Sequence, residues 1–313
     1  VPLTVPVIGV AHYSLMLLHR SRQTAGIPIG GIADLDLARA MKQLTTAGWT
    51  ADHYASDNPA DAMTKGATGI TEIADQLIDL SEIDVVVEAT SIPTAGIRHC
   101  RRAIAAGHHI IMVNVEADVV AGPLLAREAQ AAGVVYSLAW GDQPALICEH
   151  VDWARTCGFE VVCAGKGTRY HPSYHELTPD SVWEVLQQYL EIDDPTSINM
   201  KMFNSFLDGS KSGIEMSAVC NTTGLTPQAN DLGFPPSSRF ALANVCKPSE
   251  DGCMLSRRGT TEVVSSLPRS GEPVPHHLAM GAHVLDDRAG DHAKRCFTEH
   301  HITAEHTGRH DPQ

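Results

Sequence analysis

Short apolar runs alternate with helix-like segments along the first half of the chain. Strand-like runs of β-branched and other apolar residues lie at 4–9, 27–33, 84–89, 109–115, 133–137 and 159–165. Segments with apolar residues at helical spacing and a glycine at the end lie at 35–48, 94–107, 116–133 and 143–158. Because parallel strands need long crossover connections, this alternation predicts an α/β fold with a doubly wound parallel sheet.

The pattern changes after Lys166. A polar, turn-rich segment is followed by a helical stretch at 203–223, and the region from 225 to 275 is rich in proline, glycine and serine, with one clear strand at 260–267. We therefore expect a Rossmann-like dinucleotide-binding domain at 1–165, a second α+β catalytic and substrate domain at 166–295, and a tail at 296–313.

Composition limits the partners of the protein. The 313 residues include 23 basic and 37 acidic side chains, a net charge of −14. This charge repels nucleic acid and anionic membranes, and no apolar run approaches the roughly 20 residues that span a bilayer. Since the N-terminus also lacks a basic region followed by an apolar stretch, we expect a cytoplasmic protein with a small-molecule substrate.

The eight cysteines form no C-x-x-C pair, so neither a disulfide framework nor a zinc ribbon is indicated. The histidine-rich segment 299–310 is typical of a solvated tail, with metal binding as the alternative.

The first strand-like run leads into VPVIGVAHYS, residues 5–14. In the dinucleotide motif G-x-G-x-x-G, the first glycine forms the turn, the second lets the backbone approach the pyrophosphate and the third lets helix and strand pack. Gly9 takes the first position, Ala11 and Ser14 take the other two, and His12 crowds the turn. A helix N-terminus attracts phosphate without glycine, so we expect a weakened cofactor turn.

Two further strand ends support a cofactor site. Asp34 ends the second run, where an acid binds the ribose hydroxyls, and Asp36 would repel a 2′-phosphate. NAD is therefore favoured over NADP, although Arg39 one helical turn further leaves NADP open; capping of the next helix is the alternative role of Asp34. The third mark is the set at the end of a later strand, Glu88, Ala89 and Thr90.

Catalytic candidates lie in the second half. In one continuous helix, Asp208, Lys211 and Glu215 would share a stripe, where the lysine could polarise a carbonyl while a carboxylate moves a proton or holds a metal. The alternative is a solvated face with ordinary ion pairs. Lys166 stands between two glycines after a strand, or is a surface lysine in a turn. Asp142 is a catalytic candidate or a helix N-cap.

A loop supplies a further candidate group, which could bind a metal or shuttle a proton. Its members are His171, Tyr174, His175 and Glu176.

Long segments resemble one family. GIADLDLARA, VVVEATSIPTAGIRH, VVCAGKGTRY, KMFNSFLDGSKSGIEMSAVCNTTGL and the stretch from IIMVNVEAD to QPALICE are similar to the homoserine-dehydrogenase-like oxidoreductases with a C-terminal SAF domain, which include the 1-deoxyxylulose 5-phosphate reductoisomerase-like enzymes. The resemblance covers about residues 7 to 309. It implies a Rossmann domain, a catalytic domain and NAD(P)-dependent chemistry, with a divalent metal in the reductoisomerase-like branch.

The resemblance also implies roles for individual residues. The residues that would line the cofactor are Gly9, Asp34, Glu88, Ala89, Thr90 and Asn114, with Glu116 next to them. The residues that would face the active cleft are Glu116, Asp118, Asp142, Lys166, Asp208, Lys211 and Glu215. Glu116 and Asp118 open a helix, and complementing its positive end is their alternative role.

The chain departs from these relatives at three places. GVAHYS stands where the relatives have a complete G-x-G-x-x-G. Val115 stands where homoserine dehydrogenases have a lysine, which argues against homoserine as the substrate. The chain ends at GRHDPQ, where relatives continue into the SAF domain.

The sequence therefore predicts an NAD(P)-dependent oxidoreductase or reductoisomerase for a small polyhydroxylated or phosphorylated carbonyl or alcohol substrate. Two alternatives remain open: a cofactor-free isomerase or lyase on the same scaffold, and a non-catalytic binding subunit. A homo-oligomer, most simply a two-fold dimer, is expected.

Overall fold

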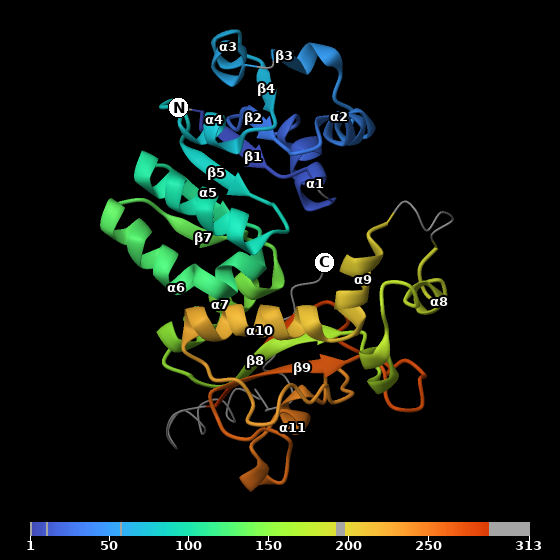
Figure 1. The fold of residues 1–313 in the computed structure, drawn as a ribbon. Coiled ribbons are helices and arrows are strands. Elements are labelled where there is room, and N and C mark those ends of the chain that lie inside the picture. The colour runs from blue at the N-terminus through green and yellow to red at the C-terminus, as the bar shows by residue number, and fades with distance from the viewer. Residues whose placement is uncertain (1, 11, 57, 192–197, 288–313) are drawn as a thin grey trace. The chain divides into compact units, whose positions relative to one another are not determined.

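The computed structural model describes residues 2–10, 12–56, 58–191 and 198–287 (Figure 1). The chain divides into two compact units, Val1–Trp140 and Gly141–Gln313. This boundary replaces the one expected after residue 165, because the strand at 159–165 belongs to the sheet of the second unit. Three expected features lie outside the described residues: Ala11 of the glycine motif, the tail at 296–313 and the histidine-rich segment 299–310.

The first unit is a seven-stranded sheet with helices on both faces, as the sequence predicted. The strand order is β3-β4-β2-β1-β5-β6-β7, and all neighbours are parallel. Its strands are β1 (Val5–Ile8), β2 (Ile29–Ala33), β3 (Tyr54–Ser56), β4 (Thr68–Thr71), β5 (Val85–Glu88), β6 (His109–Met112) and β7 (Tyr136–Leu138). Its helices are α1 (His12–Ser21), α2 (Leu37–Thr46), η1 (Ala51–His53), α3 (Pro59–Thr64), α4 (Ala74–Ile78), α5 (Pro93–Ala106) and α6 (Val115–Ala132).

Two apolar cores cover the faces of this sheet. One core contains side chains of α1 and α2, such as Leu18 and Leu44. The other contains side chains of α4, α5 and α6, such as Leu77, Ile104 and Leu125. The chain passes from β1 to β2 on one side, and β5 pairs with β1 on the other. The carboxyl end of β1 is therefore a switch point, the place where doubly wound sheets bind ligands.

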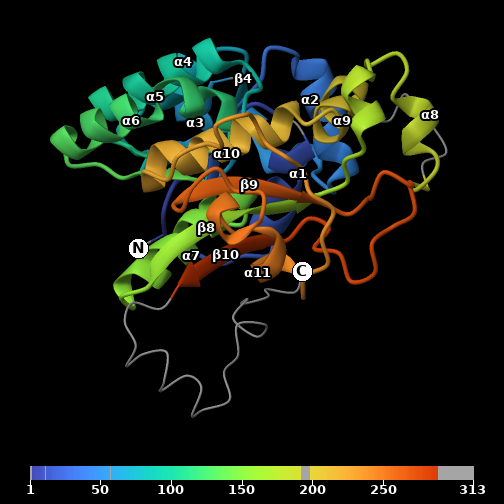
Figure 2. The ribbon, with the colours of Figure 1, turned by 90° about the horizontal axis from the view of Figure 1, so that it is seen from below.

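The second unit is built on a three-stranded mixed sheet, in which β8 lies between β9 and β10 (Figure 2). β8 (Glu160–Thr168) is parallel to β9 (Thr260–Ser265) and antiparallel to β10 (Ala282–Asp287). The helical elements are α7 (Gln143–Thr156), η2 (Pro172–Glu176), α8 (Trp183–Leu186), α9 (Met200–Leu207), α10 (Ser210–Thr223), α11 (Leu242–Val245) and η4 (Ser249–Asp251).

The two faces of this small sheet have different coverings. Helices α7 and α10 pack on one face, over Val161, Ala164 and Val263. The opposite face, over Val162 and Val264, is covered by α11 and the loops next to it (Figure 1). Side chains of β8 consequently belong to either face, and the register shift opposite Leu285–Asp286 changes their alternation.

The described part of the chain contains no helix that is both long enough and apolar enough to cross a membrane.

Candidate functional site

The glycine turn after β1 is formed as the motif requires. Gly9 has φ +94°, a left-handed conformation that side-chain-bearing residues rarely adopt. A Cβ atom on Gly9 would lie 2.9 Å from the backbone of Ala89 and from the amide nitrogen of Thr90. The ends of β1 and β5 therefore meet backbone to backbone, and only glycine allows this contact. Ser14, in the third position of the motif, is fully buried in α1.

Asp34 is the acid that was expected to contact the ribose, and its carboxylate is engaged within the protein. Its Oδ2 accepts a hydrogen bond from the Val10 amide at 2.7 Å, and its Oδ1 accepts from the Asp36 amide and from Arg39 Nη2, both at 2.9 Å. The N-cap of α2 is Asp36, not Asp34. Asp34 thus fixes the glycine turn to the end of β2, and the half-exposed guanidinium of Arg39 lies at the same place.

Glu88, Thr90 and Asn114 form a polar network at the carboxyl ends of β5 and β6. The Glu88 side chain is completely buried; its Oε1 accepts from Thr90 Oγ1 at 2.5 Å and lies 3.2 Å from His99 Nδ1. Asn114 caps α6 by accepting from the Ala117 amide, and its Nδ2 donates to Thr90 Oγ1. All three residues were expected to line a cofactor; Glu88 and Asn114 are buried, at 0% and 2% exposed, and Thr90 is partly exposed.

Asp118 was expected at the active cleft, but it lies inside the first unit. The residue is 4% exposed, and its Oδ1 accepts a hydrogen bond from Tyr136 Oη at 2.7 Å. Burial raises the pKa of Asp118, and the hydrogen bond from Tyr136 opposes part of that rise. Glu116 lies with it in the first turn of α6, as expected for acids at a positive helix end.

The second unit contains a buried ion pair between Lys166 and Glu215. Lys166 lies within β8 and is 3% exposed, and Glu215 lies on α10 and is 4% exposed. The Lys166 ammonium donates to Glu215 Oε2 and, at 2.9 Å, to Gln143 Oε1. Lys166 is therefore not a surface lysine in a turn, and three elements, β8, α10 and α7, supply one polar cluster.

Burial raises the pKa of Glu215 above its usual range, and Lys166 opposes that rise. Asp142 adds to the rise and Lys211 opposes it, so both charges act on this carboxylate. Asp142 is also the N-cap of α7, where its side chain accepts from the Gln143 amide at 2.9 Å. The structure thus brings Lys166, Glu215, Asp142 and Lys211 into electrostatic contact.

Asp208 does not share a helical stripe with Lys211 and Glu215. The expected continuous helix at 203–223 is two helices, α9 and α10, separated at Gly209, which has φ +90°. The Asp208 carboxylate accepts from Asn204 Nδ2 and from the Ser210 amide, each at 2.8 Å. Its described contacts fix the bend between the helices.

The loop histidines have local structural contacts. The His171 side chain caps η2 by accepting from the Ser173 amide, and His175 Nδ1 lies 3.1 Å from the Asp208 carbonyl oxygen. His171 is partly buried and His175 is exposed, and among the described residues they belong to no group of potential metal ligands.

Gln143 is a member of the cluster that sequence reasoning missed. It is 8% exposed, and its Nε2 donates to the Met280 carbonyl oxygen while its Oε1 accepts from Lys166. The sequence feature that could have identified Gln143 is its position directly after the N-cap Asp142. An uncharged amide side chain, however, belongs to no sequence motif that indicates a site.

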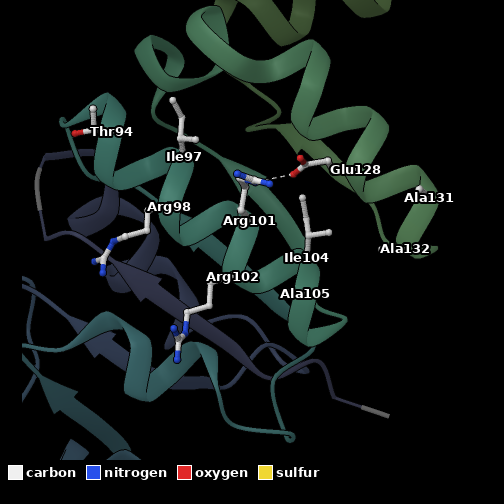
Figure 3. Close-up of a pocket in the computed structure, with 10 residues that line it drawn as sticks. All are labelled: Thr94, Ile97, Arg98, Arg101, Arg102, Ile104, Ala105, Glu128, Ala131 and Ala132. Atoms are coloured by element: carbon white, nitrogen blue, oxygen red, sulfur yellow. Dashed lines mark hydrogen bonds and ion pairs between the residues drawn. The ribbon is translucent and has the colours of Figure 1, made fainter.

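An open groove between α5 and α6 is a different feature of the first unit (Figure 3). It is lined by Arg98, Arg101 and Ile104 of α5 and by Ala131 of α6, and Arg101 pairs with Glu128 at its rim. The lining runs along α5 from Thr94 to Ala105 and meets α6 at Glu128, Ala131 and Ala132, and it includes none of the residues expected to hold the cofactor. The groove therefore does not belong to the expected cofactor site.

Solved structures that are similar to parts of this chain include three oxidoreductases. They are a homoserine dehydrogenase from Thiobacillus denitrificans (18% identity over 72% of this chain and 50% of that chain, TM-score 0.49), a DOX-P reductoisomerase bound to fosmidomycin and magnesium (14%, 72% and 58%, TM-score 0.46) and an NAD binding oxidoreductase from Klebsiella pneumoniae (18%, 56% and 44%, TM-score 0.39). The chain spans about half the length of such structures. No curated protein matches the chain.

Family models match both units. Residues 9–138 match the NAD binding domain of homoserine dehydrogenase, and residues 141–310 match the catalytic domain of oxidoreductase DRL. The junction between the two matches coincides with the division between the structural units at Trp140 and Gly141. Because the second match covers more than half of the chain, the protein belongs to the oxidoreductase DRL family.

Proposed function

We propose that the protein is an NAD(P)-dependent oxidoreductase or reductoisomerase that acts on a small polyhydroxylated or phosphorylated carbonyl or alcohol substrate. The observation that carries this proposal is the buried cluster of Lys166, Glu215 and Gln143, which lies in the segment that matches an oxidoreductase catalytic domain. A buried ion pair is a poor source of stability, whereas buried charges with shifted pKa values gather at functional sites.

The residues at the switch point fit a dinucleotide. Gly9 and Ala89 bring two strand ends together without a side chain between them, and Asp34 holds the turn through the Val10 amide. The residues proposed to hold the cofactor are Gly9, Val10, Asp34, Arg39 and Thr90. The bound nicotinamide would supply hydride transfer to or from a substrate carbon.

The cluster in the second unit would handle the substrate oxygen and its proton. An ammonium group has three donors, and Glu215 and Gln143 accept two of those of Lys166. The third can polarise a substrate carbonyl oxygen, as preorganised donors do in other enzymes. Glu215 would hold the transferred proton, and burial, which raises its pKa, favours the protonated form.

Calorimetric titration of the chain with NAD, NADH, NADP and NADPH tests the proposal. We expect micromolar binding of at least one of the four, and loss of that binding in Gly9→Ala. Hydride transfer to candidate sugars and sugar phosphates would then be followed by nicotinamide absorbance. A folded chain that binds none of the four cofactors contradicts the proposal.

One observation favours a second candidate, a cofactor-free isomerase or lyase on the same scaffold. Both oxygens of Asp34 are already hydrogen bonded within the protein, which reduces what the carboxylate offers to a ribose. In that case the four cofactors would not bind, while a substrate-dependent activity would still be lost in Lys166→Met.

A further inference from the structure

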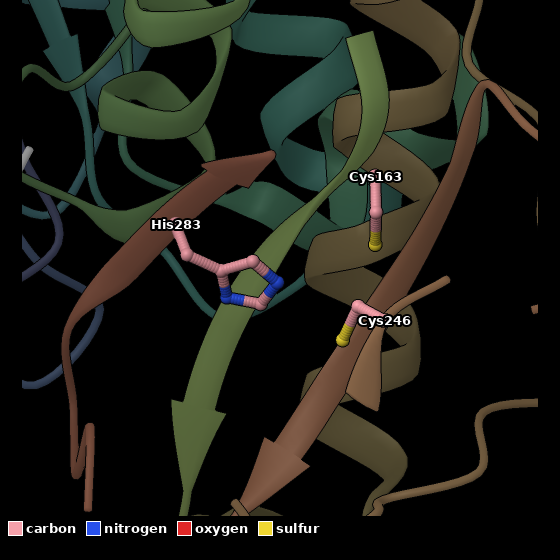
Figure 4. A group of neighbouring side chains, drawn as sticks. All are labelled: Cys163, Cys246 and His283. Atoms are coloured by element: carbon pink, nitrogen blue, oxygen red, sulfur yellow. The ribbon is translucent and has the colours of Figure 1, made fainter. Parts of the chain in front are cut away.

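Cys163, Cys246 and His283 lie together in the second unit, on the face of the small sheet that α11 covers (Figure 4). Cys163 comes from β8, Cys246 directly follows α11, and His283 comes from β10, where it pairs with Gly165. One ligand atom of each side chain lies within 4.8 Å of the other two. Lys166 lies on β8 three residues from Cys163, but it faces Glu215 of α10 on the other side of the sheet. The trio is therefore separate from the proposed substrate cluster.

All three side chains are buried, and the His283 ring has no hydrogen-bond partner for either nitrogen in the described part of the chain. Cys163 is 0%, Cys246 1% and His283 5% exposed. The neighbours are apolar side chains such as Leu242, Leu255 and Val264. A buried polar group without a partner is unfavourable, so a ring with two such nitrogens needs an explanation.

We propose that Cys163, Cys246 and His283 bind a Zn²⁺ ion. Thiolate and imidazole are the ligands that Zn²⁺ prefers, and two cysteines with one histidine form a known donor set. Two thiolates and a neutral imidazole balance the charge of the ion, so the complete site is neutral and compatible with an apolar surrounding. Binding releases the thiol protons to solvent.

The spacing of the ligand atoms is close to that of a zinc site. Tetrahedral bonds of about 2.3 Å to sulfur place two sulfur atoms about 3.8 Å apart. The ligand atoms of the three side chains are at most 4.8 Å apart. Rotations of the side chains that move these atoms by about 1 Å would bring them to the distances of a zinc site. Three protein ligands leave a fourth position that no other described cysteine, histidine or acid occupies.

Glu262 is a buried acid whose charge acts on the trio, so its role as a ligand has to be considered. Its charge influences the pKa of Cys163, and burial raises its own pKa. Its Oε1 accepts from the amides of Gly233 and Val263, and its Oε2 accepts from Gln228 and the Gly233 amide. These bonds account for the Glu262 carboxylate, so the trio rather than Glu262 defines the site.

The ion would connect three segments that are distant in sequence. It would join the strand that carries Lys166 to β10 and to the chain after α11. This role is independent of the cofactor chemistry proposed above, and its failure would leave that proposal untouched.

The test uses the full chain purified without a histidine tag, kept reduced and stripped with a chelator. Titration with Zn²⁺ should show tight binding at this site and raise the melting temperature. Titration with Co²⁺ should give an intense thiolate-to-cobalt absorption band, which histidines alone, such as those at 299–310, do not produce.

Ligand variants decide whether the trio is the site. Cys246→Ser and His283→Gln should each weaken zinc binding by roughly 100-fold or more. Cys163→Ser should also remove most of the cobalt band. Cys220→Ser is the matched control, because Cys220 is a thiol of the same unit that contacts Thr261 outside the trio; it should bind zinc and cobalt as the unchanged chain does.

The first test uses only the unchanged chain, so its result does not depend on whether a variant folds. Absence of the thiolate-to-cobalt band in the folded, reduced wild-type chain overturns the proposal. So does a band and zinc affinity that survive in Cys246→Ser and His283→Gln.

Discussion

At the scale of single residues, the Lys166–Glu215 pair makes the sharpest prediction. Replacing Lys166 with methionine leaves a buried carboxylate without its counter-charge, which typically costs about 3–5 kcal/mol. Replacing both residues, in Lys166→Met with Glu215→Leu, removes both charges and should restore much of that loss. Both variants should lose activity by about 10²–10⁴-fold, because the proposed donor is gone.

Urea unfolding and activity assays of the unchanged chain, Lys166→Met, Glu215→Leu and the double variant provide the measurement. Lys201→Met, which changes an exposed lysine of α9, is the control and should alter stability and activity little. If the stability loss of the double variant equals the sum of the two single losses, the two side chains are not energetically coupled.

Asp118 predicts a pH dependence of stability in the first unit. Its folded pKa lies above the unfolded value because of burial, so the folded state binds the proton more tightly. The resulting stabilisation is complete below the unfolded pKa, near 3.8, and is lost as pH rises through the folded pKa. Relative to Asp118→Asn, which does not titrate, the unchanged chain should therefore become less stable as pH rises, by at most about 1.4 kcal/mol per pH unit.

The hydrogen bond from Tyr136 supplies a second variant for this measurement. Tyr136→Phe removes the donor that opposes the pKa rise of Asp118, so the pH range of the loss should extend upward. Urea unfolding at a series of pH values compares Tyr136→Phe with Tyr136→Phe plus Asp118→Asn. A difference that does not change with pH would contradict the role assigned to Asp118.

Arg39 predicts cofactor choice. Its guanidinium lies on Asp34, where it offsets the negative charge that would repel a 2′-phosphate. In Arg39→Ala the repulsion from Asp34 is unopposed, so binding of NADP should weaken more than binding of NAD. Calorimetric titration with both cofactors measures the ratio, and Arg22→Ala, an exposed arginine of the same unit, is the control. Equal weakening of the two cofactors would contradict this role of Arg39.

Single residues also show which parts of the candidate site could be predicted from the sequence and which could not. Gly9 could be identified, since the turn after a first strand has a known glycine requirement. The burial of Lys166 could not, because two flanking glycines are as typical of a surface turn as of a strand, and only the partners Gln143 and Glu215 reveal the difference. Asp34 was found for its position, but its bonds to Val10 and Arg39 depend on distant backbone.

At the scale of elements, we expect a substitution in the turn between β1 and α1, at Gly9, to lower stability more than a substitution at Gly26, which lies before β2. Gly9 and Gly26 have similar conformations, φ +94° and +87°, but a Cβ on Gly9 would meet the backbone of Ala89 and Thr90 at 2.9 Å, whereas a Cβ on Gly26 would meet nothing within 4 Å. Gly26→Ala should therefore cost about 1 kcal/mol from conformation alone, and Gly9→Ala roughly 1–3 kcal/mol more.

Urea unfolding gives both costs, and calorimetry gives the effect on the cofactor. Gly9→Ala should abolish cofactor binding, while Gly26→Ala should leave it unchanged. Similar stabilities for the two variants would mean that the contact between Gly9 and Ala89 imposes no constraint.

Elements with strong periodicity were predicted best. The helices at 94–107 and 116–133 were found with their glycine ends, because their apolar spacing and left-handed C-terminal glycines are local signals. Strands β3, β4 and β10 were missed, since they are short or contain glycine, histidine and acids that are atypical of buried strands. The bend at Gly209 was also missed, because the sequence on both sides of it favours a helix.

At the scale of the whole molecule, local pattern could not place the division between the units. The run at 159–165 has the composition of a buried parallel strand, and β8 is indeed parallel to β9. Periodicity gives no information about which sheet a strand joins, because that choice depends on contacts with residues about 100 positions further along the chain. The helix α7 was consequently assigned to the first unit, although it packs on the sheet of the second.

The two units predict separate responses to two ligands. Each has its own apolar core, so a ligand should stabilise first the unit that binds it. A ligand present at 100 times its dissociation constant stabilises the folded state by about 2.7 kcal/mol, which slows amide hydrogen exchange near the site.

Hydrogen exchange with mass spectrometry can follow both ligands in one preparation. The preferred dinucleotide should protect amides of the first unit, around Gly9, Asp34 and Thr90, and Zn²⁺ should protect β8, β10 and the segment around Cys246. If adding the dinucleotide does not slow amide exchange around Gly9, Asp34 and Thr90, the cofactor does not bind at the switch point. If adding Zn²⁺ does not slow exchange around Cys246, the trio binds no metal. The two sets of amides belong to different units, so either result can be obtained without the other. Peptides of the first unit therefore test the cofactor proposal, and peptides of the second unit test the zinc proposal.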